Sequence, residues 1–207
     1  MALVYPNATL TPSKRELMAA WLPARPWYDG QERKPVGSFR FDDPAGEVGL
    51  EGFLLGGEGL STLFLPMTYR AAALDGAEDH LIGTTDHSEL GPRWVYDGCG
   101  DPVFLRSLAH AILTGATGVD QEFDLGDGKE SRPTNAQVRG SGSADDADGP
   151  EVDAVGCHDE GPLTIVNAGP LELVVARVVG TDLDAAQTLA VTWKGGTDVV
   201  IAGVRPA

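Results

Sequence analysis

The sequence has few cysteines and few basic residues, and each shortage excludes a class of ligand or partner. It contains only two cysteines, Cys99 and Cys157, and neither has a second Cys or a His at the spacing of a zinc site. We therefore expect no metal. The chain carries 15 basic against 31 acidic residues, a net charge of −16, so it would repel a phosphate backbone or an anionic membrane. We expect neither nucleic acid nor a membrane as a partner.

Long hydrophobic runs are also missing. No segment approaches the ~18 consecutive apolar residues of a membrane-spanning helix, and the first residues lack the basic and hydrophobic regions of a secretory signal. The hydrophobic content is nevertheless 42% of 207 residues, which is enough for a packed core. We therefore expect a cytoplasmic protein that folds as one domain or as two small ones.

Two helices are predicted from local start signals. Thr11 and Pro12 match an N-cap followed by proline at the first helical position, which predicts a helix to about Leu22. Its apolar side chains fall on one face, which we expect in the core: Leu17, Met18, Trp21 and Leu22. Asp101 and Pro102 repeat the start signal, and the following helix is expected to end near Gly115.

Short β-like runs separated by turn residues fill most of the remaining sequence. They predict an antiparallel arrangement, with strands at 38–41, 47–55, 62–69 and 90–97, and again at 163–166, 171–179, 189–193 and 199–204. The glycines of 56–59 predict a hairpin turn, because they lack the spacing of a phosphate-binding loop. Residues 116–134 are polar and unpatterned, and 140–150 have the composition of a linker, so both are expected to be mobile.

No pattern in the chain predicts a catalytic centre or a cofactor site. The four histidines stand in different contexts, and no Gly-x-Ser-x-Gly motif is present. The catalytic loop of a phosphotransferase would show His-x-Asp, but no histidine here is followed two residues later by aspartate. We therefore predict no catalytic residue and no cofactor.

Residues 69–115 nevertheless contain a series of short phrases that resemble a known family. The phrases are Tyr69-Arg70, Leu81-Ile82-Gly83-Thr84, His87, Leu90-Gly91, Arg93-Trp94, Tyr96-Asp97 and Asp101-Pro102. The segment from Ala20 to Pro23 and the segment from Asp43 to Gly49 also fit. Together they resemble the N-terminal cap domain of maltokinase and related sugar kinases, with the kinase part missing. Some relatives of this kind carry an α-glucan-branching label.

The resemblance implies a fold and a set of boundaries. Caps of this family are similar to cystatin, with a curved antiparallel sheet wrapped on a helix that packs against the nucleotide-binding lobe of the kinase. We therefore expect an α+β fold with that sheet, followed by a small antiparallel β-rich segment. The expected division is a cap-like domain at 1–115, an acidic mobile linker at 116–150, and a β-rich segment at 151–207 that completes or packs on the sheet.

Five residues of the matched segment are candidates for partner or ligand contact, because they combine large side chains with charge: Arg70, Arg93, Trp94, Tyr96 and Asp97. Structural roles are open for some of the same residues. Trp94 could be a core anchor, and Arg93 could pair with Asp97 on one strand face. Asp101 is explained as an N-cap, which is worth about 1 kcal/mol.

Three functions remain open from the sequence. The first is a non-catalytic interaction or regulatory module for a sugar kinase or a trehalose- or glycogen-pathway enzyme; it predicts an apolar, aromatic-rimmed surface and a protein partner or self-association. The second is carbohydrate or nucleotide-sugar binding, which requires Trp21, Trp27, Tyr28 and Trp94 to form an exposed stacking platform. The third is an unrecognised small enzyme, which requires a cleft that holds titratable groups with shifted pKa values.

Overall fold

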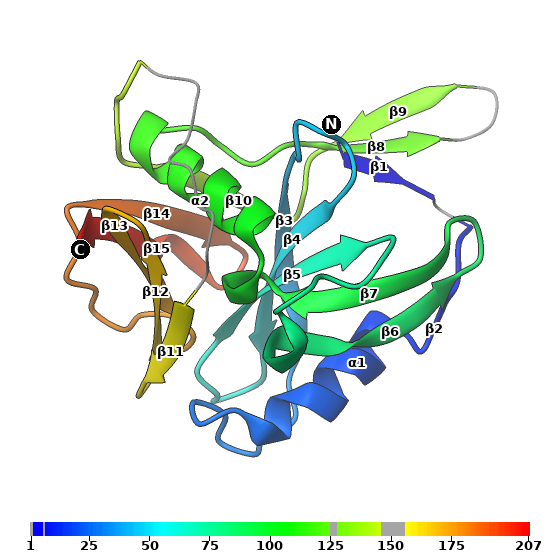
Figure 1. The fold of residues 1–207 in the computed structure, drawn as a ribbon, viewed down its shortest axis with the longest axis horizontal. Helices are drawn as coiled ribbons and strands as arrows, with labels where there is room; N and C mark the ends of the chain where they lie inside the picture. The colour runs from blue at the N-terminus through cyan, green and yellow to red at the C-terminus, as the bar shows by residue number, and fades with distance from the viewer. Residues whose placement is uncertain (1, 6, 125–127, 146–155) are drawn as a thin grey trace.

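The computed structural model describes residues 2–5, 7–124, 128–145 and 156–207 (Figure 1). These residues form two six-stranded antiparallel sheets, one small sheet and two α-helices. The first sheet has the order β2-β6-β7-β5-β4-β3, and the second has the order β10-β14-β15-β13-β12-β11. The helices are α1 (Lys14–Trp21) and α2 (Pro102–Thr114), and short 3-10 turns are η1 (Leu22–Ala24), η2 (Glu78–His80) and η3 (Gly98–Gly100).

The strands of the first sheet are β2 (Leu10–Thr11), β3 (Lys34–Phe41), β4 (Gly49–Gly56), β5 (Leu63–Arg70), β6 (Leu81–His87) and β7 (Gly91–Asp97). Those of the second are β10 (Ala136–Gly140), β11 (Gly156–Glu160), β12 (Leu163–Ala168), β13 (Leu171–Ala176), β14 (Gln187–Trp193) and β15 (Gly196–Pro206). The small sheet joins β1 (Ala2–Val4), β8 (Gln121–Asp124) and β9 (Lys129–Arg132), with β1 parallel to β8. The expected fold class, a curved antiparallel sheet with a helix followed by further antiparallel strands, is confirmed.

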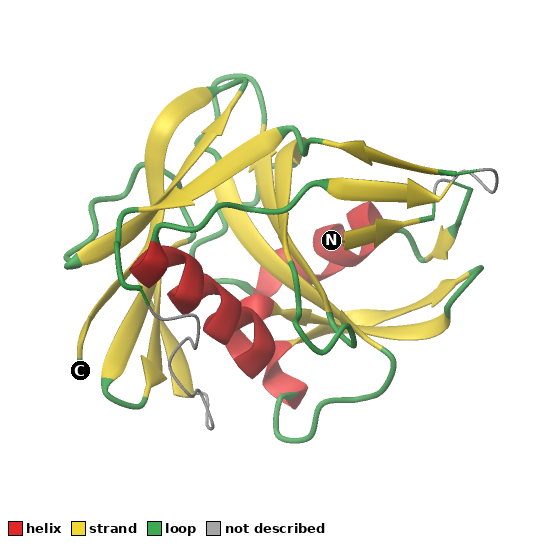
Figure 2. Cartoon of the chain, turned by 90° about the horizontal axis from the view of Figure 1, so that it is seen from above, coloured by secondary structure: helices red, strands yellow, loops and turns green. Residues whose placement is uncertain are grey.

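The first sheet is covered on both faces (Figures 1 and 2). On one face α1 buries Leu17, Met18 and Trp21 against strand residues that include Phe53 and Leu65. The alternate residues of the same strands point the other way, as the period of two in a strand requires. They join α2 and the second sheet in a larger core, so the first sheet is the middle layer of the molecule.

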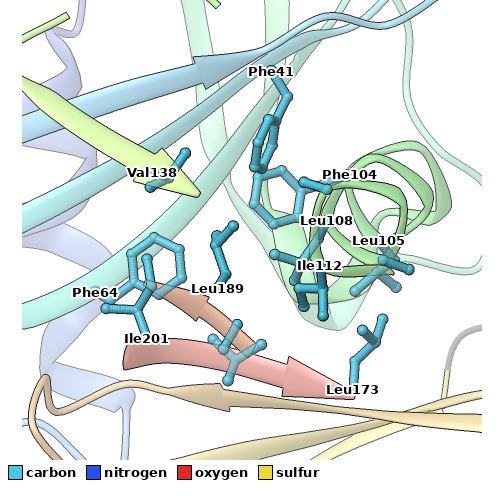
Figure 3. Packing of buried hydrophobic residues seen from close by; sticks show 14 of the residues in the cluster. Phe41, Phe64, Phe104, Leu105, Leu108, Ile112, Val138, Leu173, Leu189 and Ile201 are labelled. Atoms are coloured by element: carbon cyan, nitrogen blue, oxygen red, sulfur yellow. The ribbon is translucent and has the colours of Figure 1, made fainter. Parts of the chain in front are cut away.

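The larger core brings α2 between the two sheets (Figure 3). Phe104, Leu108 and Ile112 lie on one face of the helix and are fully buried. They belong to one buried apolar cluster with Phe41 and Phe64 of the first sheet and Leu189 and Ile201 of the second, and the Phe104 ring centroid lies 6.1 Å from that of Phe41 (Figure 3). Because burial of such side chains contributes about 1.5–3 kcal/mol each, this cluster is the main link between the two sheets.

The start of α1 differs from the prediction, whereas its buried face is confirmed. Ser13, not Thr11, is the N-cap, and Ser13 and Glu16 form a capping box in which each side chain bonds the backbone N–H of the other. Thr11 is instead in β2, where Leu10 and Thr11 pair with His87 and Asp86 of β6. The pairing holds this segment extended, so the helix cannot begin at Pro12.

The start and end of α2 are confirmed. The Asp101 side chain accepts from the backbone N–H of Val103, Pro102 is at the first position, and Gly115 ends the helix with a φ of 73°. The hairpin turn predicted at 56–59 is also confirmed, because it joins β4 to β5. Both features depend on contacts within a few residues, which is why the sequence shows them.

The polar region after α2 contains strands that the sequence did not predict. β8 and β9 lie within 116–134, and β10 precedes the stretch of linker-like composition. Part of that stretch packs on α2: Gly140 and Gly142 pass so close that an added Cβ would lie 1.8 and 2.0 Å from the carbonyl oxygens of Ala111 and Leu113. These two glycines are therefore needed for packing. The rest of the predicted linker, 146–150, lies outside the described residues.

Candidate functional site

Two buried carboxylates flank the single turn η3 at the end of β7. Asp97 caps this turn by accepting from the backbone N–H of Cys99, and Asp101 caps α2. Each carboxylate also binds a buried or half-buried arginine. The two pairs differ in where the arginine comes from and in how many of its N–H groups are used.

The Asp101 pair lies within the first sheet and is fully bonded. Arg70 donates from Nε to Oδ2 at 2.7 Å and from Nη2 to Oδ1 at 2.6 Å. Thr68 donates to Oδ2 at 2.7 Å, and the Val103 backbone N–H donates to Oδ1 at 3.0 Å. The hydrogen bonds to Asp101 raise the pKa of Arg70, so the guanidinium stays charged. This bidentate pair fixes the start of α2 against β5.

The Asp97 pair connects the first sheet to the second. Arg177, which follows β13, is 1% exposed and donates from Nη2 to Oδ2 of Asp97. Its Nε donates to Thr164 Oγ1 at 2.7 Å, and Thr164 donates to Asp159 Oδ1 at 2.5 Å. Burial lowers the pKa of Arg177, but the charge of Asp97, the hydrogen bond to it and the other acidic neighbours together raise the pKa above the ordinary value, so a full positive charge is held in the interior.

A polar pocket lies beside this pair, and we call it the junction pocket. Its volume is about 160 Å³, and residues of the α1–β3 connection, η2, β11 and β12 line it together with Asp97 and Arg177. The lining groups from outside the ion pair include Arg25, Trp27, His80 and Cys157. Titratable residues from segments that are far apart in the chain meet in the junction pocket.

Two tryptophans support the arginines of the junction pocket, and one of them, Trp27, also lines it. Trp21 and Trp27 are buried with ring centroids 6.0 Å apart. The Arg25 guanidinium carbon lies 4.4 Å from the Trp21 centroid, and that of Arg177 lies 5.1 Å from the Trp27 centroid. These cation–π contacts hold both arginines against rigid rings.

The thiol in the junction pocket is held in its protonated form. Cys157 Sγ lies 3.7 Å from His80 Nε2 and 3.9 Å from His80 Nδ1. Burial, followed by the charge of Asp97, raises the pKa of Cys157 to about 11. Nucleophilic cysteines require the thiolate, so this contact is not an activated pair. Within the described ranges, no three His, Cys, Asp or Glu side chains are placed to hold a metal ion.

The five predicted contact residues have different surroundings. The register pairs Arg70 with Trp94 and Thr68 with Tyr96, so Arg70, Trp94 and Tyr96 share the face of the first sheet next to α2. Tyr96 is buried, and its hydroxyl accepts from the backbone N–H of Leu74. Arg93 and Trp94 are half-buried. Arg70 and Asp97 use their polar groups in the two ion pairs.

Two structural roles assigned from the sequence are wrong. Asp97 pairs with Arg177, not with Arg93, because Asp97 points into the junction pocket; Arg93 donates to the carbonyl of Pro92 instead. Trp94 is not a core anchor, because it is half-buried and belongs to neither buried cluster. It is therefore available at the surface of the first sheet.

The predicted stacking platform and the predicted apolar surface are not found. Trp21 and Trp27 are in the core beneath α1, and the Tyr28 hydroxyl donates to the carbonyl of Gln31. Among the described residues, the large hydrophobic side chains that are well exposed are Val36 at 39% and Leu90 at 41%. Val36 is in β3, and Leu90 is in the turn between β6 and β7. Two isolated side chains do not make a docking patch.

A third buried charge cluster lies under α1. Glu51 is buried, and its Oε2 accepts from Lys14 at 2.5 Å and from the Tyr69 hydroxyl at 3.2 Å. Burial raises the pKa of Glu51, but Lys14 and Arg40 outweigh it, so the pKa lies below the ordinary value. This cluster fastens the first turn of α1 to β4.

The sequence reasoning missed Arg177 and the junction pocket. A signal was present: Arg177 interrupts the apolar run 173–179, where a charge is expected only if it is paired. Its partner could not be identified, because Asp97 is 80 positions away.

Comparison with known proteins relates the chain to one family. No curated protein matches it. Residues 21–101 match the family model described as the maltokinase N-terminal cap domain, a span that is less than half of the chain. The match begins at the last residue of α1 and ends at the N-cap of α2, so it covers β3 to β7 and leaves the second sheet outside. The resemblance is thereby confirmed over 21–101, where the chain is similar to the maltokinase N-terminal cap domain.

Proposed function

We propose that this protein is a non-catalytic, cap-like module that binds a sugar kinase or another enzyme of α-glucan or trehalose metabolism in the cytoplasm. The observation that carries the proposal is the family match over 21–101, which spans five of the six strands of the first sheet. Cap domains are accessory regions, and the chain has no His-x-Asp sequence for a phosphotransferase catalytic loop. No helix in the described part of the chain is long and apolar enough to cross a membrane.

We place the docking face on the part of the first sheet that carries Arg70 and Trp94. Arg93 is the neighbour of Trp94 in β7 and points to the opposite face of the sheet, because successive side chains alternate along a strand. Tryptophan and arginine dominate the energetics of protein interfaces, and Trp94 is half-exposed directly opposite Arg70. The ion pair with Asp101 holds Arg70 rigid, which lowers the entropy lost on binding. Because exposed apolar side chains are few, the interface is expected to be polar and to use these anchors.

Affinity purification from native cytoplasm tests this proposal. The tagged protein is compared with an Arg93→Glu, Trp94→Ala double variant and with Arg15→Glu, a charge reversal at an exposed site on α1. We expect a sugar kinase or a glucan-pathway enzyme to copurify with the wild type and with Arg15→Glu, and to be lost from the double variant.

Folding of all three proteins is checked by their thermal unfolding. Copurification of the same enzyme with a folded double variant would move the docking face elsewhere. The proposed partner would be contradicted if no such enzyme is recovered and sedimentation analysis shows a dimer of the wild type. Loss of that dimer in the double variant would assign the face to self-association.

A further inference from the structure

The junction pocket contains buried hydrogen-bond donors without acceptors. Arg25 Nε, Trp27 Nε1 and Arg177 Nη1 are buried, and within the described residues nothing accepts a hydrogen bond from them. All three belong to residues that line the same pocket, and they come from the α1–β3 connection and from the end of β13. A buried unpaired donor costs about 1–3 kcal/mol, so three at one place indicate a missing acceptor.

The acceptors nearest to Arg177 are already occupied. Asp97 accepts from Cys99 N–H with one oxygen and from Arg177 with the other. Asp159 Oδ1 accepts from Thr164, which in turn accepts from Arg177. The pocket therefore keeps three buried N–H groups that these bonds leave without an acceptor, beside a guanidinium that stays charged, and a ligand that bonds them must supply acceptor oxygens.

The size and charge of the junction pocket narrow the class of ligand. A volume of about 160 Å³ equals the space of about five water molecules and is well below the ~300–1,000 Å³ of pockets for drug-sized ligands. Its arginines are Arg25 and Arg177, and its carboxylates are Asp79, Asp97 and Asp159. The three carboxylates of the pocket would repel a dianion more strongly than a monoanion. A ligand carboxylate brings two acceptor oxygens with only one negative charge.

We propose that the junction pocket binds a small monocarboxylate, whose oxygens accept from Arg177, Arg25 and the Trp27 indole. Guanidinium groups match carboxylate geometry, and the stacking of both arginines on Trp21 and Trp27 prepares them for binding. The inference does not depend on the docking proposal, because the pocket lies at the junction of the sheets and not on the face that carries Trp94.

Nuclear magnetic resonance can observe one of the three donors directly. The chain has 4 tryptophans, and the indole N–H signal of Trp27 is assigned by its absence in Trp27→Phe. The full-length protein is titrated with sodium acetate at pH 7, with sodium chloride added to keep the ionic strength constant. We expect the Trp27 signal to shift saturably and the Trp94 signal to stay in place.

Arg25→Gln removes one charged donor from the pocket. Arg15→Gln is the matched control, because the Arg15 side chain is exposed on α1. We expect Arg25→Gln to weaken acetate binding roughly tenfold and Arg15→Gln to leave it unchanged. Backbone spectra establish that both variants are folded. An unshifted Trp27 signal, an equal shift with chloride alone, or unchanged binding in Arg25→Gln would overturn the proposal. Tighter saturable binding of inorganic phosphate or glycerol would overturn the assignment to a carboxylate.

Discussion

The two buried aspartate–arginine pairs beside η3 each use an aspartate that also caps a helical turn. They differ in how many N–H groups of the arginine have an acceptor. The Asp101 pair uses two N–H groups of Arg70 and adds Thr68 and the Val103 backbone, all within the first sheet and the start of α2. The Asp97 pair uses one nitrogen of Arg177, which comes from beyond the second sheet's β13, and leaves Nη1 without an acceptor.

This difference separates a structural pair from a candidate binding element. A buried ion pair stabilises a protein only when the remaining donors and acceptors are also satisfied. The Asp101 pair meets that condition, so folding alone explains it. The Asp97 pair does not meet it, and an acceptor from a ligand would complete the set.

Asp97→Ala is the change with the largest expected effect. It leaves the charge of Arg177 buried without a partner, so we expect the free energy of unfolding to fall by about 3–5 kcal/mol in urea denaturation. The double variant Asp97→Ala, Arg177→Met removes both charges and should regain most of the loss. If the double variant is as unstable as the single one, the ion pair is not what connects the two sheets.

Asp101→Ala should lower the free energy of unfolding by less than Asp97→Ala does, although Asp101 accepts more hydrogen bonds than Asp97. The Arg70 side chain is 19% exposed and can turn toward water, so we expect a loss of about 2–3 kcal/mol, of which about 1 kcal/mol is the helix cap. Asp101→Ser keeps an N-cap oxygen without the charge and separates the two parts. Equal stability of the Ala and Ser variants would show that the cap contributes nothing.

Glu51 provides a pH test of a third buried pair, that with Lys14. Because its pKa is lowered on folding, its contribution to stability is present above the ordinary pKa of 4.5 and is lost as the pH falls through the folded value. We expect Glu51→Gln to lose about 1–2 kcal/mol at pH 7 and to show a shallower decrease in Tm below pH 4.5. A parallel decrease in both proteins would contradict the assigned role.

The smallest expected effect is on the reactivity of Cys157, without a change in fold. With a pKa of about 11, roughly one thiol in a thousand is ionised at pH 8, so a disulfide reagent should react slowly, and faster as the pH rises toward 11. Asp97→Asn removes a charge that raises this pKa and should speed the reaction, whereas Asp101→Asn should not. Equal acceleration by both variants would mean that opening of the structure controls the rate.

The helices show which parts of the fold the sequence could predict. Both ends of α2 were predicted correctly. Asp101 and Pro102 start the helix and Gly115 ends it, and each of these signals acts within one turn of its own position. The start of α1 was misplaced, because pairing of Thr11 with Asp86 is a contact between distant segments. Ser13 and Glu16 did contain the capping-box signal. β11 and β9 are polar edge strands, and such strands lack the apolar alternation by which strands are predicted.

The candidate site was less predictable than the fold. Arg70, Tyr96 and Asp97 were selected for their side-chain types, and the structure assigns their polar groups to internal contacts. Local sequence contains no information on which arginine reaches which aspartate. The junction pocket depends on such pairings, because its walls come from several segments that are far apart in the chain, from Arg25 to Arg177.

The placement of Asp97 also has an evolutionary consequence. Asp97 lies inside the segment that matches the cap-domain model, while Arg177 lies outside it. A related protein without the second sheet would have no guanidinium at this point, and an unpaired buried aspartate would then be selected against. We therefore expect relatives that keep Asp97 without the second sheet to place another positive group beside it, and Asp101 and Arg70 to persist whether or not the second sheet is present.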